Sequence, residues 1–171
     1  MNNKVITIFG TGRAKEGDLI YKLAEETGRI IAQAGFTIAN GGYGGTMAAA
    51  AKGASLAHGE IIGVTCTAFK KSKANQYITK EIATNSLDKR LDTLIRLGQA
   101  YVVLPGGTGT LLELAKVWEL KNKGFLEKKK PIIMIGMFWK PLIELLEIDD
   151  PESSNQITMV SEPKQIIQFI K

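Results

Sequence analysis

A glycine-rich segment at residues 105–113, PGGTGTLLE, has the residue types and spacing of a phosphate site. It follows the apolar run 100–104 and opens a segment with helical periodicity. A strand that leads through a glycine-rich turn into a helix aims free backbone N–H groups and the positive helix end at one point. Thr108 and Thr110 add hydroxyl donors, and Glu113 lies one turn inside the helix, within reach of a sugar attached to the phosphate. The segment therefore predicts a phosphorylated ligand.

Three glycine-bearing turns follow three apolar runs, at residues 10–13, 41–46 and 106–110. Each would follow the carboxyl end of a parallel strand, so all three are expected at the same edge of one sheet. This convergence favours a nucleotide over an isolated ion, although tight strand-to-helix turns also need glycine for steric reasons alone. The residues expected to bind the phosphate or nucleotide are Gly10, Thr11, Gly12, Gly42, Gly44, Gly45, Thr46, Gly106, Gly107, Thr108, Gly109 and Thr110.

The turns differ from two common nucleotide-binding motifs. The first turn continues as GTGRAK over residues 10–15 and lacks the third glycine of the dinucleotide fingerprint, which argues against NAD. No Gly-Lys-Ser or Gly-Lys-Thr follows any turn, so the sequence contains no Walker motif. The only histidine, His58, falls at the end of an alanine-rich helical segment, where we expect a structural role. One histidine and one cysteine, Cys66, give no metal-binding cluster, and no cofactor is expected.

Arg90 lies within an apolar stripe of the helical segment 87–97. The apolar positions of that segment are Leu87, Leu91, Leu94, Ile95 and Leu97. At about 100° of rotation per residue, Arg90 falls inside the arc that they form. An arginine there needs a carboxylate or phosphate partner, or must reach the surface along its aliphatic stem. A role in the site and a structural ion pair are both open.

Glu113 has a comparable position on the segment 110–122, which is apolar on most sides. The helical count places it between Val117 and Leu120. A first-turn carboxylate would feel the positive helix end, which favours the ionised form, so a base or an acceptor for ribose hydroxyls fits better than a general acid. The alternative is a carboxylate that only caps its own helix. A helix that is apolar on most sides lies either in the centre of the domain or against a partner subunit. We therefore expect a homodimer or larger homo-oligomer formed through this helix and the segment 87–97.

The composition is that of a soluble globular domain. The chain has 171 residues, of which 44% are hydrophobic and 23% charged, enough for a domain that buries roughly 70% of its unfolded surface. The net charge of +5 invites nucleic-acid binding, but the basic clusters at 70–73 and 128–130 are short and lack aromatic neighbours, which favours a solvated surface. One cysteine, no signal peptide and no run near the ~20 residues that span a bilayer predict a cytoplasmic protein that does not bind membranes.

Apolar runs alternate with helix-like segments along the chain, the pattern of a parallel sheet covered on both faces. Strands are expected at residues 5–9, 36–40, 61–65, 100–104 and 131–136, with a short extended piece near 77–82. Helices are expected at 17–34, from the second glycine turn to about 57, at 87–97, 110–122 and 139–146, and after an N-cap at Ser161. These elements predict an α/β fold, a Rossmann-like doubly wound parallel sheet in a single domain over residues 1–171, with ligands at the carboxyl ends of the strands.

The motif PGGxGTxxE at residues 105–113 resembles the signature of the LOG-like family, often called lysine decarboxylase-like. The segment 40–48, NGGYGGTMA, is similar to the family's GGGxxGLMG-like motif. The segment 87–91, LDKRL, keeps only the arginine of its Met-His-Glu-Arg-Lys-like motif. The resemblance covers nearly the whole chain and implies a nucleoside 5′-monophosphate phosphoribohydrolase.

In family terms, Arg90 and Glu113 correspond to the catalytic pair and residues 107–110 to the phosphate cradle. Several positions depart from the pattern: Leu91 replaces a lysine, two residues of the second motif differ, and the first turn has Gly-Thr-Gly instead of Gly-Ser-Ser. These departures resemble molybdenum-cofactor carrier-like proteins, which bind a phosphorylated pterin without hydrolysing it. The decarboxylase label has no support, because a pyridoxal-phosphate enzyme needs a Schiff-base lysine in suitable surroundings.

The leading hypothesis is a hydrolase that cleaves the N-glycosidic bond of a purine nucleoside 5′-monophosphate, such as a cytokinin-type nucleotide. The phosphate would bind at residues 106–110, and the products would be the base and ribose 5-phosphate. Glu113 would hold ribose hydroxyls and activate water or stabilise an oxocarbenium-like transition state, while Arg90 would orient Glu113 or assist the leaving base. The alternatives are a non-catalytic carrier of a nucleotide-like phosphorylated cofactor and, third, a nucleic-acid-binding Rossmann-like domain.

Overall fold

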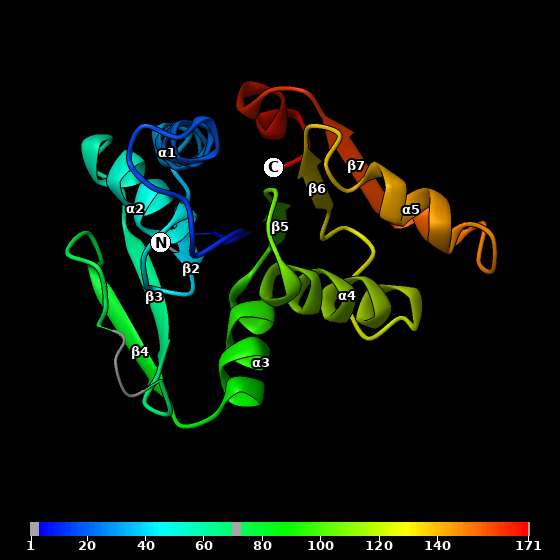
Figure 1. The fold of residues 1–171 in the computed structure, drawn as a ribbon, viewed down its shortest axis with the longest axis horizontal. Helices are drawn as coiled ribbons and strands as arrows, with labels where there is room; N and C mark the ends of the chain where they lie inside the picture. The colour runs from blue at the N-terminus through cyan, green and yellow to red at the C-terminus, as the bar shows by residue number, and fades with distance from the viewer. Residues whose placement is uncertain (1–3, 70–72, 171) are drawn as a thin grey trace.

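The computed structural model describes residues 4–69 and 73–170, which form a sheet of seven parallel strands (Figure 1). The strands are β1 (Val5–Phe9), β2 (Thr37–Asn40), β3 (Ile61–Cys66), β4 (Lys80–Thr84), β5 (Ala100–Val103), β6 (Ile132–Ile135) and β7 (Ile157–Val160). Their order across the sheet is β4-β3-β2-β1-β5-β6-β7. The expected α/β, Rossmann-like architecture is confirmed. Residues 70–72 of the first basic cluster lie outside the described residues.

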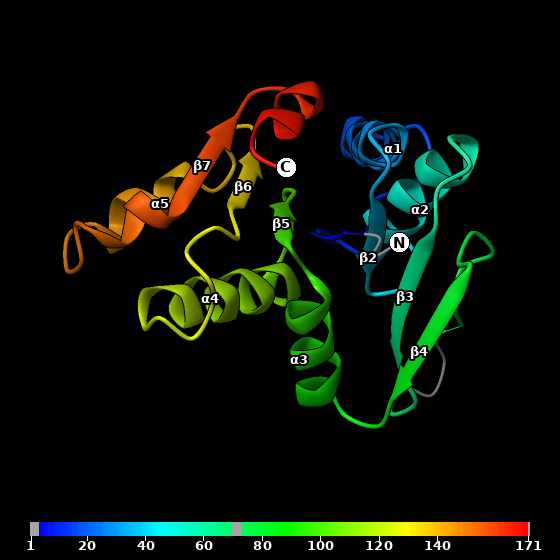
Figure 2. The same cartoon turned by 180° about the vertical axis from the view of Figure 1, so that it is seen from behind.

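Helices cover both faces of the sheet (Figures 1 and 2). The described helices are α1 (Leu19–Gln33), α2 (Thr46–Leu56), α3 (Leu87–Leu97), α4 (Thr108–Asn122), α5 (Lys140–Leu146) and the 3-10 helices η1 (Ser153–Gln156) and η2 (Pro163–Gln168). One face packs on α1, α2 and η2, and the other on α3, α4 and α5. None of the described helices is long and apolar enough to cross a bilayer.

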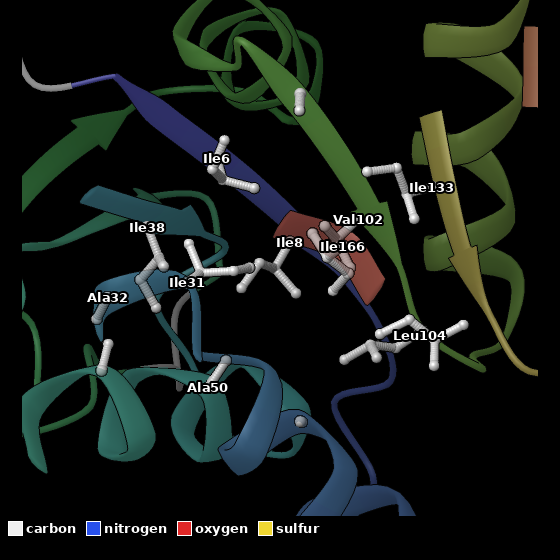
Figure 3. Packing of buried hydrophobic residues seen from close by; sticks show 14 of the residues in the cluster. Ile6, Ile8, Ile31, Ala32, Ile38, Ala50, Val102, Leu104, Ile133 and Ile166 are labelled. Atoms are coloured by element: carbon white, nitrogen blue, oxygen red, sulfur yellow. The ribbon is translucent and has the colours of Figure 1, made fainter. Parts of the chain in front are cut away.

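The core on the α1–α2 face consists mainly of aliphatic side chains (Figure 3). Ile6 and Ile38 point from adjacent strands toward Ile31 of α1, and all three are buried. Helices α1 and α2 lie side by side, and a Cβ on Gly28 of α1 would overlap the carbonyl oxygen of Ala50. The absence of a side chain there lets the two backbones touch, which brings α2 close against the sheet.

The strand order reverses beside β1, because β2 to β4 extend the sheet on one side and β5 to β7 on the other. The loops that leave the neighbouring strands β1 and β5 therefore open a crevice at the carboxyl edge. The backbone N–H of Leu104 donates to the carbonyl of Phe9 at 2.9 Å, and the indole Nε1 of Trp139 donates to the carbonyl of Leu104 at 3.0 Å. Both bonds fix the start of the turn that the sequence singles out.

Several elements differ from the sequence-based expectations. Strand β7 was not expected; its four residues, ITMV, form a strand by pairing in parallel with β6 at the sheet edge. Strand β4 begins at Lys80 instead of near residue 77, in register with β3. Helix α4 begins at Thr108, two residues earlier than expected. The last helix is a 3-10 helix capped by Glu162 instead of Ser161, with the Gln165 side chain accepting from both N–H groups.

The apolar surface of α4 is covered largely by the chain itself. Trp118 is buried, and its Nε1 donates to the carbonyl of Ser153 at 2.9 Å. Leu112 is left 45% exposed. Self-association through α3 and α4 stays a prediction. The second basic cluster is not wholly solvated as expected, because Lys130 is buried and its carbonyl accepts from Lys121 Nζ at 2.7 Å.

The α1–α2 contact predicts the effect of Gly28→Ala. Alanine is favoured over glycine in a helix by about 1 kcal/mol, yet the new Cβ would overlap Ala50 and push the helices apart. We expect a net loss of about 1–3 kcal/mol in the free energy of unfolding, measured by urea denaturation. Lys22→Ala on the exposed side of the same helix is the control, and a Gly28→Ala protein as stable as wild type would contradict the close contact.

Candidate active site

A cavity of about 860 Å³ lies at the carboxyl edge of the sheet, between the loops that follow β1 and β5. The expected site residues that line it are Gly10, Thr11, Gly12, Arg90, Gly107, Thr108, Gly109, Thr110 and Glu113. Five others do not line it: Gly42, Gly44, Gly45, Thr46 and Gly106. A second hollow of about 600 Å³ between β4 and α3 contains none of the expected residues. The cavity at the crevice is therefore the candidate site.

The N-terminus of α4 forms one wall of the cavity. Gly107 is the N-cap residue, with φ −98° and ψ −154°, and the first intrahelical bond runs from the N–H of Leu111 to its carbonyl at 2.9 Å. The N–H groups of the first helical turn have no intrahelical acceptor and are available to an anion. Gly106 does not line the cavity. It lies against Thr110, and a Cβ on Gly106 would overlap the Thr110 hydroxyl. The wall has the donors that a phosphate requires.

The predicted residues of the second glycine turn, Gly42, Gly44, Gly45 and Thr46, do not line the cavity, although Tyr43 of the same turn does. Two of the predicted residues, Gly45 and Thr46, contact the first loop. The N–H and hydroxyl of Thr46 donate to the carbonyl of Thr11 at 2.9 and 3.0 Å. A Cβ on Gly45, which has φ +64°, would overlap the backbone of the first loop. Gly42 has φ +77°, and its N–H donates to Asn40 Oδ1 at 2.8 Å. The contacts of Gly45 and Thr46 fix the first loop against the start of α2.

Arg90 of α3 is buried, with 7% of its surface exposed, and has partners on several sides. Its Nε donates to the carbonyl of Val64 at 2.8 Å, and its Nη2 lies 4.0 Å from Met47 Sδ. Its Nη1 lies 3.7 Å from Glu113 Oε1. The ion pair is long for a hydrogen bond, so the guanidinium retains donors for a ligand. The two charged residues singled out by the helical count thus meet on the cavity wall.

Burial raises the pKa of Glu113 to about 7, although Arg90 acts to lower it. Burial thus acts against the ionised form that the helix end was expected to favour. Because α4 begins at Thr108, Glu113 is in the second turn, where the influence of the helix end has faded. The side chain is 14% exposed, so desolvation outweighs the long ion pair. A carboxyl group that titrates near neutral pH can exchange a proton with a ligand or water.

Several apolar or aromatic residues of the cavity were not anticipated. They are Tyr43, Met47, Phe69, Leu87, Leu91 and Leu112, and Arg13 also lines the wall. The sequence offers a signal for two of them: Tyr43 is the one residue with a side chain within the turn GGYGG, and Phe69 is an aromatic residue within a polar loop. His58 and Cys66 lie outside the cavity. His58 is exposed and follows the C-cap of α2 with φ 55°, and its structural role stays a prediction.

The sequence profile of the SLOG cluster4 family matches residues 3–167. The chain belongs to this family. It is 31% identical to an uncharacterized protein of Archaeoglobus fulgidus over 77% of the present chain and 84% of that protein. The SLOG cluster4 chain is also 27% identical to a protein of Rhodococcoides fascians named cytokinin riboside 5′-monophosphate phosphoribohydrolase, over 84% of the present chain and 74% of the relative.

Among solved structures, the SLOG cluster4 chain is similar to the molybdenum cofactor binding protein of the phototrophic bacterium Rippkaea orientalis. The TM-score is 0.80 at 26% identity, and the match covers 99% of the present chain and 96% of the other. The resemblances to the LOG-like family and to cofactor carriers drawn from the sequence motifs are both confirmed.

The position of Gly41 predicts a selective effect on Arg90. A Cβ on Gly41 would overlap Nη2 of Arg90, which is pinned through Nε to Val64. We expect Gly41→Ala to displace the guanidinium and lower the free energy of unfolding by about 1–3 kcal/mol in thermal or urea denaturation. Gly44→Ala in the same turn is the control, because nothing lies within 4 Å of a Cβ there. Equal stability of the two variants would contradict the pinned arrangement.

The raised pKa of Glu113 predicts a pH dependence of stability. The folded state holds the proton more tightly than the unfolded chain, so this stabilisation is present below pH 4.5 and is lost as the pH rises through about 7. The free energy of unfolding of wild type, measured relative to that of Glu113→Gln, should therefore fall by on the order of 2 kcal/mol between pH 5 and pH 8. Urea denaturation at several pH values measures the difference. Glu119→Gln, an exposed position on the same helix, controls for the loss of a carboxylate.

Proposed function

We propose that this protein hydrolyses the N-glycosidic bond of a purine nucleoside 5′-monophosphate and releases the base and ribose 5-phosphate. The proposal rests on one observation: Oε1 of Glu113 lies 3.7 Å from Nη1 of Arg90 on the wall of a cavity that the N-terminus of α4 also lines. The order along the wall is helix terminus, carboxylate, guanidinium. That order matches a ligand with a phosphate, a sugar and a leaving group in sequence.

In the proposed reaction, the phosphate binds the N–H groups and hydroxyls of residues 107–110. This binding holds the ribose against Glu113, whose carboxylate stabilises positive charge as the bond between C1′ and the base nitrogen breaks. The bonding electrons leave with the base. A water oxygen forms the new bond to C1′, and its proton passes to Glu113. The base nitrogen takes up a proton from solvent, and loss of the Glu113 proton to solvent restores the carboxylate. Arg90 holds Glu113 in place and offers its remaining N–H groups to the leaving base.

The relatives support a nucleotide hydrolase as the enzyme class. The alignment with the Rhodococcoides fascians protein named cytokinin riboside 5′-monophosphate phosphoribohydrolase covers 74% of that protein. A pocket of about 860 Å³ is within the size range of small-molecule sites and is wide enough for a nucleotide. The purine preference and the hydrolysis itself belong to the proposal.

A non-catalytic carrier of a phosphorylated cofactor is the second candidate. Leu91, which replaces the lysine of the LOG-like motif, lines the cavity and is 3% exposed, so the wall loses a charged group beside Arg90. The similar structure from Rippkaea orientalis is named as a molybdenum cofactor binding protein. An apolar wall with an anion site holds a flat phosphorylated ligand without requiring chemistry.

The proposed reaction predicts the behaviour of Glu113→Gln with AMP. The change keeps the shape but removes the negative charge, so adenine release should fall by at least a hundredfold while AMP affinity changes little. Arg90→Ala should act likewise. In wild type, turnover should rise with pH through about 7, because the ionised carboxylate is the active form. Chromatographic detection of free adenine measures the reaction, and Glu119→Gln should retain wild-type turnover.

The same assay separates the two candidates. Tight binding of nucleoside monophosphates with no base released from any purine or pyrimidine nucleotide would overturn the hydrolase and favour the carrier. Base release that survives in Glu113→Gln would instead assign Glu113 a structural role.

A further inference from the structure

Two aromatic rings lie against the guanidinium of Arg90 on the cavity wall. The ring centroids of Tyr43 and Phe69 lie 5.6 and 5.9 Å from the guanidinium carbon. The two rings contact each other at 5.8 Å with a tilt of 48°. The wall therefore continues past the carboxylate and the guanidinium into an aromatic pair, on the side where the proposed function requires a base.

Hydrogen bonds hold the described residues on either side of residues 70–72. The hydroxyl of Tyr43 accepts from the N–H of Cys66 at 2.7 Å and donates to its carbonyl at 3.2 Å. The N–H of Phe69 donates to the same carbonyl at 3.0 Å. Farther along the loop, Asn75 Nδ2 donates to the carbonyls of Gly42 and Tyr43 at 3.2 and 3.0 Å. The backbone near the ring is thus positioned before any ligand arrives.

The Phe69 ring itself is not part of the core. It is 37% exposed, and its described ring contacts are with Tyr43 and Arg90. An aromatic side chain held at a cavity rim with part of its surface in water has apolar area left to cover. A flat heterocycle would cover it, and base–aromatic stacking contributes favourably to binding whatever the base.

The wall beside the aromatic pair is largely apolar. Among the described residues that line the cavity there is no asparagine, glutamine or aspartate, and the charged side chains that could pair with a base edge are Arg13, Arg90 and Glu113, of which the last two form an ion pair. Met47, Leu87, Leu91 and Leu112 are apolar. Recognition by stacking and apolar contact accepts any planar base and favours purines, which have the larger ring area.

We propose that Phe69 is a specificity-determining residue whose ring stacks on the heterocycle of the ligand, so that the site selects nucleotides over simple sugar phosphates by ring area and tolerates changes of base. The inference rests on the proposed binding of a nucleoside monophosphate but not on its hydrolysis. It assigns to the loop after β3 a role separate from the anion site at α4.

Calorimetric titration with AMP, UMP and ribose 5-phosphate tests the inference. All proteins carry Glu113→Gln so that no nucleotide is hydrolysed, and wild type here means Phe69 in that background. Wild type should bind AMP more tightly than UMP, and both more tightly than ribose 5-phosphate. Phe69→Leu keeps an apolar side chain but removes the aromatic face, so AMP affinity should fall roughly tenfold while ribose 5-phosphate affinity stays within about twofold. Phe69→Tyr should retain AMP affinity, and Phe125→Leu, an exposed position outside the cavity, should bind as wild type.

The outcomes separate this inference from the proposed function. If wild type binds none of the nucleotides, the proposed function fails and the stacking role fails with it. If wild type binds AMP no better than ribose 5-phosphate, or Phe69→Leu binds AMP as tightly as wild type, stacking alone is overturned. An equal loss for AMP and ribose 5-phosphate in Phe69→Leu would also overturn it, because the ring would then act only by positioning Arg90.

Discussion

The strand order reverses at β1, so that the sheet extends to both sides of this strand. The cavity lies where the order reverses. Strands β2 to β4 lie on one side of β1 and β5 to β7 on the other, with the connecting helices of the two halves on opposite faces. The loops that leave β1 and β5 therefore part from each other at the carboxyl edge. The first loop and the N-terminus of α4 become the walls, and α3 brings Arg90 between them.

The burial of Arg90 imposes the strictest local demands on the site. A guanidinium removed from water needs partners around it, since an unpaired buried charge costs several kcal/mol. The structure supplies a backbone carbonyl, two aromatic rings and a carboxylate, and it leaves room through the missing side chain of Gly41. The carboxylate in turn is desolvated enough to titrate near pH 7. Charged pairs perturbed in this way are more typical of functional sites than of structural ion pairs.

The same wall suits both a hydrolase and a carrier, and the difference between them lies in Glu113. A carrier needs an anion site and a flat apolar surface, which the turn at α4 and the aromatic pair provide. A hydrolase also needs a group that responds to charge developing at the sugar. In the proposed function Glu113 is that group, because it lies 3.7 Å from Arg90 on the helix whose N-terminus lines the cavity.

The parallel sheet, most of its strands and helices and the edge at which the cavity lies could be predicted from the sequence, because apolar periodicity and glycine turns are local properties. Arg90 and Glu113 could also be singled out, since each breaks the apolar pattern of its own helix. Tertiary structure alone decided which glycines line the cavity, that residues 157–160 form a strand, and that Phe69 contacts Arg90. The burial that raises the pKa of Glu113 also comes from tertiary structure. These features depend on what distant segments place beside a residue, and neither register, burial nor desolvation is encoded within a short stretch of chain.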